Sequence, residues 1–154
     1  MTCGVTRLYK TVTSCFASRQ GVQSTSSGEA EFYGATSVVM YGKVVKHFLE
    51  WLDYEVIYQL MMDSSAAKAV IQRDGVGKVK HLDVRALWIQ AERRDQGLIT
   101  RKVPGAQNLP DLGAKTHPVA RFLELRDMLG IMDCKAIEDL KEIEVAAFRR
   151  RAKT

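Results

Sequence analysis

The sequence has no long hydrophobic run, few cysteines and no acidic residue before Glu29. The longest uncharged stretch in the first predicted helix spans residues 32–42, which falls short of the ~20 residues that a membrane span needs. The first ten residues contain an early arginine and no sustained apolar segment, so they do not resemble a signal peptide. These absences favour an intracellular protein without a membrane anchor.

The three cysteines, Cys3, Cys15 and Cys134, are odd in number and show neither CxxC nor metal-ligand spacing. Reduced thiols of an intracellular protein are therefore the expected state. The three histidines are also far apart in the sequence, which argues against a zinc site.

The charge is unevenly distributed between the two halves of the chain. Residues 1–77 contain seven basic and seven acidic residues, whereas residues 78–154 contain sixteen and eleven, so the whole net charge of +5 lies in the second half. A basic half favours a polyanionic partner, with nucleic acid as the first candidate. The alternative, a solvated basic surface without a partner, is equally consistent with the charge.

Hydrophobic patterning predicts one mixed α/β domain. Strands are expected at residues 4–9, 11–19, 55–63 and 98–103, the first two as a hairpin and the third buried on both faces. Helices are expected at residues 29–52, 64–72, 81–96, 118–129 and 133–151, with a short helix after Asn108. In the helix at residues 118–129, the side chains expected to face the core are Val119, Phe122, Leu123 and Leu125. The order of elements indicates a mixed sheet with packed helices.

Two glutamates open the longest predicted helix, and helical geometry separates their roles. Glu31 falls in the apolar stripe formed by Val38, Val45 and Leu49, whereas Glu29 points to nearly the opposite side. The interaction of a first-turn acid with the helix dipole is a sufficient explanation for Glu29. A carboxylate in the sheet-facing stripe must be paired, metal-bound or at an open edge, because burying it alone costs several kcal/mol.

Two aspartates stand where predicted elements end or begin. Asp63 closes a buried strand, a position where α/β sheets place ligands and catalytic groups. A helix N-cap is the alternative for Asp63, although the adjacent serines could fill that role. Asp111 lies in the first turn of a short helix, for which a helix-dipole partner is the simpler explanation. If both converge with Glu31, their oxygens form the ligand set that Mg²⁺ or Mn²⁺ needs to activate water at a phosphodiester.

The chain resembles the ribonuclease H domain of copia-type retrotransposon polyproteins in five segments: STSSGEAEFYGA, MMDSSAAKAVIQ, GKVKHLDVRALWIQ, KVPGAQNLPDLGAK and RFLELRDMLG. Their order and spacing are those of the family, and the resemblance covers roughly residues 4–131. It implies a ribonuclease H-like fold, a five-stranded mixed sheet flanked by helices. It also implies cleavage of the RNA strand of an RNA–DNA hybrid with two divalent ions, Mg²⁺ or Mn²⁺, held by four acids.

The resemblance assigns three metal ligands in this chain. Glu31 matches the glutamate of the family's first long helix, Asp63 the aspartate of its fourth strand, and Asp111 its last aspartate. The family's first acid, an aspartate on its first strand, has no counterpart, because the chain starts at what corresponds to the second strand. Since the first strand is central in such a sheet, its absence exposes the flanks of its neighbours and removes one metal ligand.

The family's KHIDIR-like segment matches the stretch that contains Lys78, Lys80, His81, Asp83 and Arg85. The match implies contacts of Lys78, Lys80 and Arg85 with the hybrid, together with a structural role for the segment. An ordinary solvated loop is the alternative for the two lysines.

We therefore expect a fragment of a retrotransposon Pol polyprotein, with a truncated ribonuclease H-like domain at residues 4–131 and a basic helical extension at residues 132–154. Because three of four carboxylates bind metal weakly, the chain alone should be inactive or severely impaired. The expected partners are an RNA–DNA hybrid and the reverse transcriptase part of the same polyprotein, in cytoplasmic virus-like particles or in the nucleus. The alternative is a non-catalytic nucleic-acid-binding or interaction protein that uses the basic second half.

Overall fold

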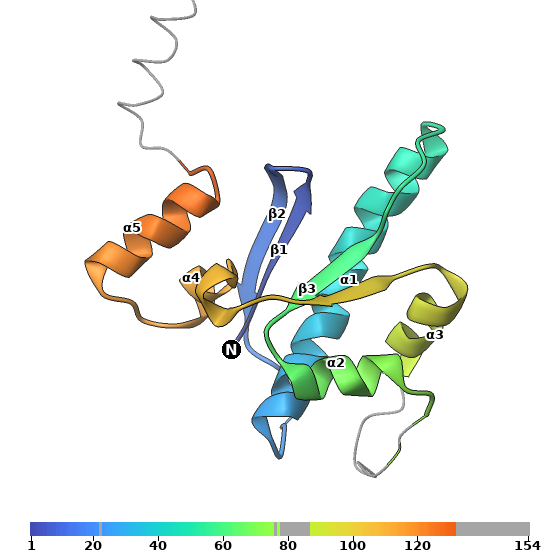
Figure 1. The fold of residues 1–154 in the computed structure, drawn as a ribbon, viewed down its shortest axis with the longest axis horizontal. Coiled ribbons are helices and arrows are strands. Elements are labelled where there is room, and N and C mark those ends of the chain that lie inside the picture. Colours follow the sequence, from blue (N-terminus) through green and yellow to red (C-terminus); the bar gives the residue numbers. More distant parts are fainter. Residues whose placement is uncertain (22, 76, 78–86, 132–154) are drawn as a thin grey trace, which may run out of the picture. The chain divides into compact units, whose positions relative to one another are not determined.

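The computed structural model describes residues 1–21, 23–75, 77 and 87–131 (Figure 1). The chain divides into two compact units, Met1–Thr116 and His117–Thr154. Within the described residues the architecture is mixed α/β, with five α-helices and two separate two-stranded sheets. None of the described helices combines the length and the apolar character that crossing a membrane requires. The helix predicted at residues 133–151 lies outside the described residues.

The elements follow the predicted order. The first unit contains β1 (Thr2–Leu8), β2 (Thr11–Ser18), α1 (Ser27–Trp51), β3 (Gln59–Met62), α2 (Ser65–Gln72), α3 (Trp88–Asp95), β4 (Ile99–Lys102), the short 3₁₀ helix η2 (Gly105–Gln107) and α4 (Asp111–Ala114). The second unit contains α5 (Val119–Met128). The predicted element types are confirmed for the strands and α-helices among these segments, whereas η2 was not predicted. The helix predicted from residue 81 is described only from Trp88.

β1 and β2 form an antiparallel hairpin, as their β-branched and aromatic residues predict. The register places Val5 opposite Cys15 and shifts between Thr6 and Arg7. Tyr9 occupies the turn with a φ of 54°, a left-handed conformation that is uncommon for a residue other than glycine. The hairpin therefore forms through its strand pairing in spite of an unfavourable turn sequence.

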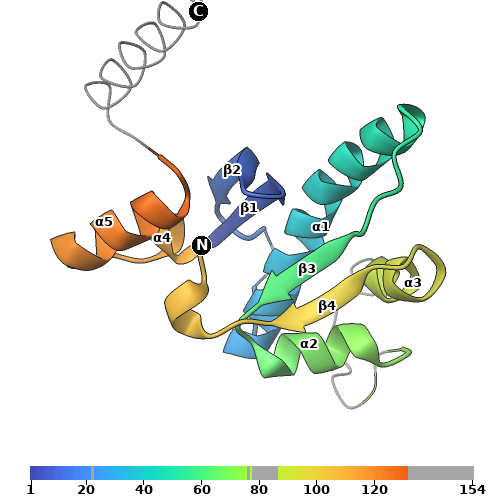
Figure 2. The same ribbon diagram turned by 45° about the horizontal axis from the view of Figure 1, so that its top comes forward.

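β3 and β4 form a parallel pair in which Leu60 lies opposite Thr100, and Figure 2 shows the two arrows side by side. Leu60 and Met62 are buried, but Gln59 and Met61 are exposed. The prediction of a strand buried on both faces is therefore wrong, because only one face of β3 packs on the core. A nearly continuous apolar run indicates burial on both faces only where a second layer covers the sheet.

α1 begins with a variant of the capping box, in which Glu29 does more than the predicted charge–dipole interaction. Ser26 caps the helix, and its Oγ accepts a hydrogen bond from the Glu29 backbone N–H at 3.2 Å. The Glu29 carboxylate reaches back and accepts hydrogen bonds from the backbone N–H of Thr25 at 2.7 Å and from its hydroxyl at 2.9 Å. Glu29 is buried, so these hydrogen bonds stabilise the start of the helix.

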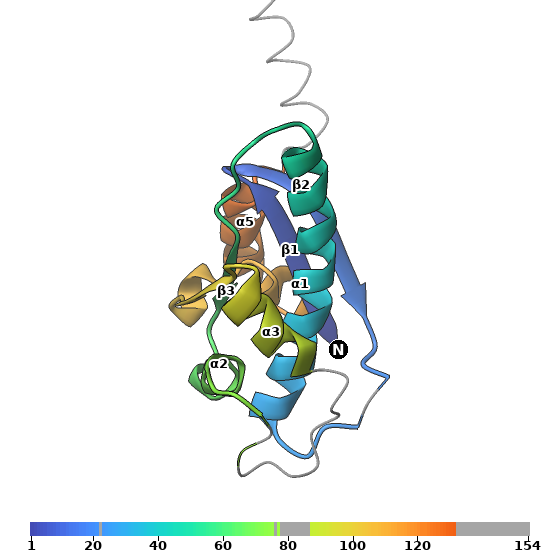
Figure 3. The same ribbon diagram turned by 90° about the vertical axis from the view of Figure 1, so that its right-hand side faces the viewer.

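The core of the first unit lies between α1, α2, α3 and β3. Its fully buried side chains include Phe32 and Val39 of α1, Ile71 of α2 and Ile89 of α3. Figure 3 shows α1 running alongside both the hairpin and β3, so one long helix supports both sheets.

The hairpin packs against α1 through a close contact at Gly4. A Cβ added at Gly4 would lie 2.5 Å from side-chain atoms of both Val38 and Phe16, so the contact requires glycine. The Phe16 ring also stacks on Tyr41 of α1, with ring centroids 4.5 Å apart. These contacts fix the hairpin on the helix that carries Glu31.

In the second unit, α5 does not bury the stripe that its periodicity predicts. Leu125 is fully buried, but Val119, Phe122 and Leu123 are 75, 47 and 40% exposed. The core-facing prediction is therefore correct for one side chain and wrong for three. Periodicity identifies the apolar side of a helix but not whether another element covers it.

Candidate functional site

Asp63 follows β3 directly and does not cap the next helix. Ser64 is the N-cap of α2, and its Oγ accepts a hydrogen bond from the Ala67 backbone N–H at 3.2 Å. Asp63 is half-buried, and its Oδ2 accepts a hydrogen bond from Asn108 Nδ2 at 3.2 Å. The alternative role for Asp63 is thus excluded, because a neighbouring serine supplies the cap.

Asp111 is the first residue of α4, a helix of only four residues. Its Oδ1 accepts a hydrogen bond from Asn108 Nδ2 at 2.8 Å, and Lys115 Nζ donates to Oδ1 at 3.0 Å and to Oδ2 at 2.9 Å. So short a helix has little macrodipole. The contacts with Asn108 and Lys115, rather than a helix dipole, therefore account for the position of this carboxylate.

The turn that carries Asp111 is anchored to the hairpin by a close approach at Gly113. A Cβ added to Gly113 would lie 2.6 Å from Cys3 Sγ. Burial and the neighbouring Cys15 raise the pKa of the Cys3 thiol, so it stays protonated at neutral pH. A residue larger than glycine at this position would displace either the thiol or the turn.

Glu31 of α1 completes the group. The residue is exposed overall, but its carboxyl group is partly desolvated. This burial raises the pKa of Glu31, and the charges of Asp63 and Asp111 raise it as well, while Lys115 lowers it. Glu31, Asp63 and Asp111 are therefore within electrostatic reach of one another, and we refer to them as the acid cluster. Glu31 is therefore not a buried, isolated charge, because its side chain is exposed and Lys115 acts on it electrostatically.

Asn108 and Lys115 are site residues that the sequence patterns did not reveal. Asn108 joins Asp63 to Asp111 through a single amide, and Lys115 places a positive charge beside the acid cluster. A signal was present in the sequence, because these residues stand three positions before and four positions after Asp111. Such spacings bring side chains together on a helical turn.

The acid cluster has the donor chemistry of a site for a hard divalent cation. Carboxylate and amide oxygens are the ligands that Mg²⁺ accepts in proteins. Among the described residues, however, no three His, Cys, Asp or Glu side chains are arranged so that they could hold a metal ion. The three acids are thus of the ligand type that Mg²⁺ binds, but by themselves they do not form a complete coordination shell.

The three predicted hybrid-contact residues, Lys78, Lys80 and Arg85, lie outside the part of the chain that the structure describes. The same holds for His81 and Asp83. Their proximity to the acid cluster therefore stays a prediction.

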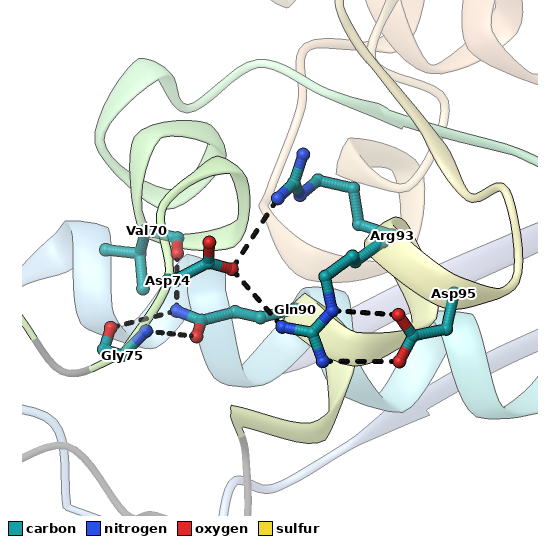
Figure 4. Close-up of polar contacts among 7 residues, drawn as sticks. Val70, Asp74, Gly75, Gln90, Arg93 and Asp95 are labelled. Carbon is teal, nitrogen blue, oxygen red and sulfur yellow. Dashed lines mark hydrogen bonds and ion pairs between the residues drawn. The ribbon is translucent and has the colours of Figure 1, made fainter.

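A second polar cluster joins the end of α2 to α3 (Figure 4). Gln90 is buried, and its Nε2 donates hydrogen bonds to the carbonyl oxygens of Val70 at 2.8 Å and Gly75 at 3.1 Å. Its Oε1 accepts a hydrogen bond from the Gly75 backbone N–H at 2.8 Å. Asp74 lies beside it and pairs with the two arginines of α3 at 3.7 and 3.5 Å. We refer to Gln90, Asp74 and the residues that they contact as the Gln90 cluster. The sequence patterns did not predict it.

Comparison with known proteins does not assign the chain to a family. No family model matches the sequence, and no solved structure matches the fold. The acid cluster is therefore the feature on which a functional assignment depends.

Proposed function

We propose that the chain is the greater part of a ribonuclease H domain of a copia-type retrotransposon Pol polyprotein. The observation that carries this proposal is the convergence of Glu31, Asp63 and Asp111 from three separate elements. These are the residues that the sequence resemblance selects as metal ligands. Like charges that are brought together from separate elements are costly for stability and typical of functional sites.

The arrangement of strands also supports the proposal. The described residues form one antiparallel pair, β1–β2, and one parallel pair, β3–β4, and both pairs pack on α1. Removing the central strand from a five-stranded mixed sheet would leave two such pairs. A ribonuclease H-like sheet without its first strand therefore accounts for two small sheets on one supporting helix.

The reaction would be hydrolysis of the RNA strand of an RNA–DNA hybrid, giving a 3′-hydroxyl and a 5′-phosphate. Bound Mg²⁺ or Mn²⁺ would supply an activated water and charge stabilisation at the leaving oxygen. By the resemblance, Glu31, Asp63 and Asp111 would be three of the four carboxylates that hold the ions, with Asn108 orienting the two aspartates. The resemblance finds no counterpart of the family's first aspartate among these 154 residues, so we expect the chain by itself to bind metal weakly and to be inactive or severely impaired.

A hybrid-cleavage assay tests this function. The chain alone should not cleave the RNA strand above background in Mg²⁺ or Mn²⁺. A version with an N-terminal extension that adds one extended, partly apolar segment with an aspartate, of the DADW kind, should cleave it. Cleavage should be lost with Asp63→Asn, and also when the aspartate of the extension is replaced by asparagine.

Two results would count against the proposal, and they differ in meaning. Robust cleavage by the unextended chain that disappears with Asp63→Asn would overturn the expected impairment but keep the nuclease. An extended chain that unfolds in one cooperative transition and still does not cleave hybrid would overturn the ribonuclease H assignment.

A non-catalytic nucleic-acid-binding role is the second candidate. It is favoured by the ion pair between Lys115 and Asp111, which partly neutralises the acid cluster without a metal. This role requires salt-dependent binding to duplex or hybrid that survives both chelation of metals and Glu31→Gln. Fluorescence anisotropy of a labelled hybrid in EDTA, at several salt concentrations, separates it from the nuclease.

A further inference from the structure

The Lys115 side chain contacts the atoms of the acid cluster that a metal ion would use. Its Nζ lies 3.0 and 2.9 Å from the two carboxylate oxygens of Asp111. Asn108 Nδ2 donates to the same carboxylate and to Asp63. Two hydrogen-bond donors thus occupy aspartate oxygens that would have to bind a cation.

We propose that the Lys115 ammonium group is a built-in counter-ion of the acid cluster, which a divalent cation must displace in order to bind. The inference rests on the proposed function, because it assumes that these carboxylates bind metal. It adds a residue that regulates metal affinity at that site.

Electrostatics support displacement rather than joint occupancy. Lys115 carries one positive charge, and its Nζ lies 3.0 and 2.9 Å from the two carboxylate oxygens of Asp111, one of the three acids of the cluster. A divalent ion among the same oxygens would stand close to the ammonium group, and like charges at such distances repel. The contact of Lys115 with Asp111 and the binding of a metal ion are therefore mutually exclusive.

The side chain is free to leave the site. The Lys115 side chain is 57% exposed, whereas that of Asp111 is 15% exposed. Lys115 follows α4 as its C-cap residue, so its long side chain can turn into solvent without movement of the helix. Displacement requires a change of side-chain rotamer rather than of fold.

The proposal predicts opposite effects of Lys115 on stability and on metal binding. Without metal, the lysine relieves repulsion among the acids, so its removal should lower the melting temperature. With metal, the same removal should strengthen binding, because no internal cation competes. A lysine with a purely structural role would weaken both properties when removed.

The test is Mn²⁺ binding to the full chain by calorimetry or electron paramagnetic resonance. Lys115→Met should bind Mn²⁺ about fivefold more tightly than the parent chain, as expected for loss of a competing, partly exposed ion pair. Lys115→Arg, which keeps the charge, should bind like the parent. The matched control is Lys102→Met, because Lys102 Nζ donates to Ser65 Oγ rather than to a carboxylate. This control should change Mn²⁺ affinity less than about twofold.

Thermal unfolding in EDTA and in saturating Mn²⁺ provides the second readout. Lys115→Met should have a lower melting temperature than the parent in EDTA, and this difference should disappear in Mn²⁺.

Equal or weaker Mn²⁺ binding by Lys115→Met, or no Mn²⁺ binding by any variant, would overturn the inference. If Lys115→Met binds more tightly but the extended chain does not cleave hybrid, only the proposed function fails. If the extended chain cleaves hybrid and Lys115→Met does not bind more tightly, only the inference fails.

Discussion

The acid cluster and the Gln90 cluster are both groups of polar side chains in the first unit, but their hydrogen bonding differs. In the Gln90 cluster, the donor and the acceptor of the Gln90 side-chain amide both form hydrogen bonds with complementary backbone groups. In the acid cluster, acceptors outnumber donors, and the repulsion is relieved only in part by Asn108 and Lys115. The first arrangement holds a loop in place, whereas the second costs stability unless a cation is added. This difference separates a structural cluster from a functional candidate.

The largest effect is expected from Gln90→Leu. The substitution leaves two carbonyl groups and one N–H, from Val70 and Gly75, without their partner beside the core. The free energy of unfolding in urea should fall by about 2–4 kcal/mol. Gln72→Leu is the matched control, because exposed Gln72 makes one side-chain hydrogen bond, to Thr100. A similar loss in both variants would show that burial of the amide is not the cause.

Gly113→Ala should have the next largest effect. The added methyl group would overlap Cys3 Sγ, so overpacking should lower stability by about 1–3 kcal/mol. Cys3→Ala makes room, and in that background the same substitution should cost less than about 1 kcal/mol. A double-mutant cycle in urea measures the coupling. Additive effects would mean that the hairpin does not fix the turn that carries Asp111.

Glu31→Gln should stabilise the metal-free chain at neutral pH, in contrast to Gln90→Leu. The substitution removes one of three like charges, and solvent screening of this exposed residue keeps the gain below about 1 kcal/mol. Urea unfolding in EDTA measures it. A loss of stability would mean that the Glu31 carboxylate makes net favourable contacts, and the contrast between the clusters would disappear.

The gain from Glu31→Gln should depend on pH with a definite sign. The pKa of Glu31 is raised in the folded state, so the folded chain binds the proton more tightly than the unfolded chain. The parent is therefore penalised above the folded-state pKa and recovers as pH falls through it. The difference between variant and parent should be largest at pH 7 and absent below the ordinary pKa of 4.5. Unfolding series in EDTA between pH 4 and 7 test this trend.

The smallest effect is expected from Asp74→Asn within the Gln90 cluster. Asp74 is 69% exposed and lies 3.5 Å or more from its arginine partners. Exposed ion pairs of this kind contribute little, so stability should change by less than about 0.5 kcal/mol. A loss comparable to that of Gln90→Leu would show that the ion pairs, rather than the buried amide, hold the loop.

Local patterns predicted much of the fold. The hairpin, α1, β3, α2, β4 and the helices near residues 111 and 119 lie where periodicity and capping signals place them. The burial of these elements was harder to predict, as the exposed face of β3 and the exposed Phe122 of α5 show. Burial depends on a second element that local sequence does not specify.

The three carboxylates of the acid cluster were predicted from the sequence, but the side chains that contact them were not. Glu31 and Asp63 could be identified from the sequence because an ordinary structural role does not fully explain either residue. For Asp63, the structure excludes the N-cap role, because Ser64 caps α2 instead. Asn108 and Lys115 were missed because their roles exist only once Asp63 and Asp111 are close together. Gln90 was missed for a similar reason, since its partners are backbone groups that carry no side-chain signature.

The division of the strands into two pairs has a consequence for the behaviour of the chain in concentrated solution. In the described residues, each strand has one neighbouring strand, so its second edge has no strand beside it, and such an edge can pair with another molecule. β1, with the sequence TCGVTRL, has a single charged side chain to discourage pairing with another molecule. Self-association should therefore increase with concentration, and a charged substitution at a solvent-facing position of β1 should improve solubility.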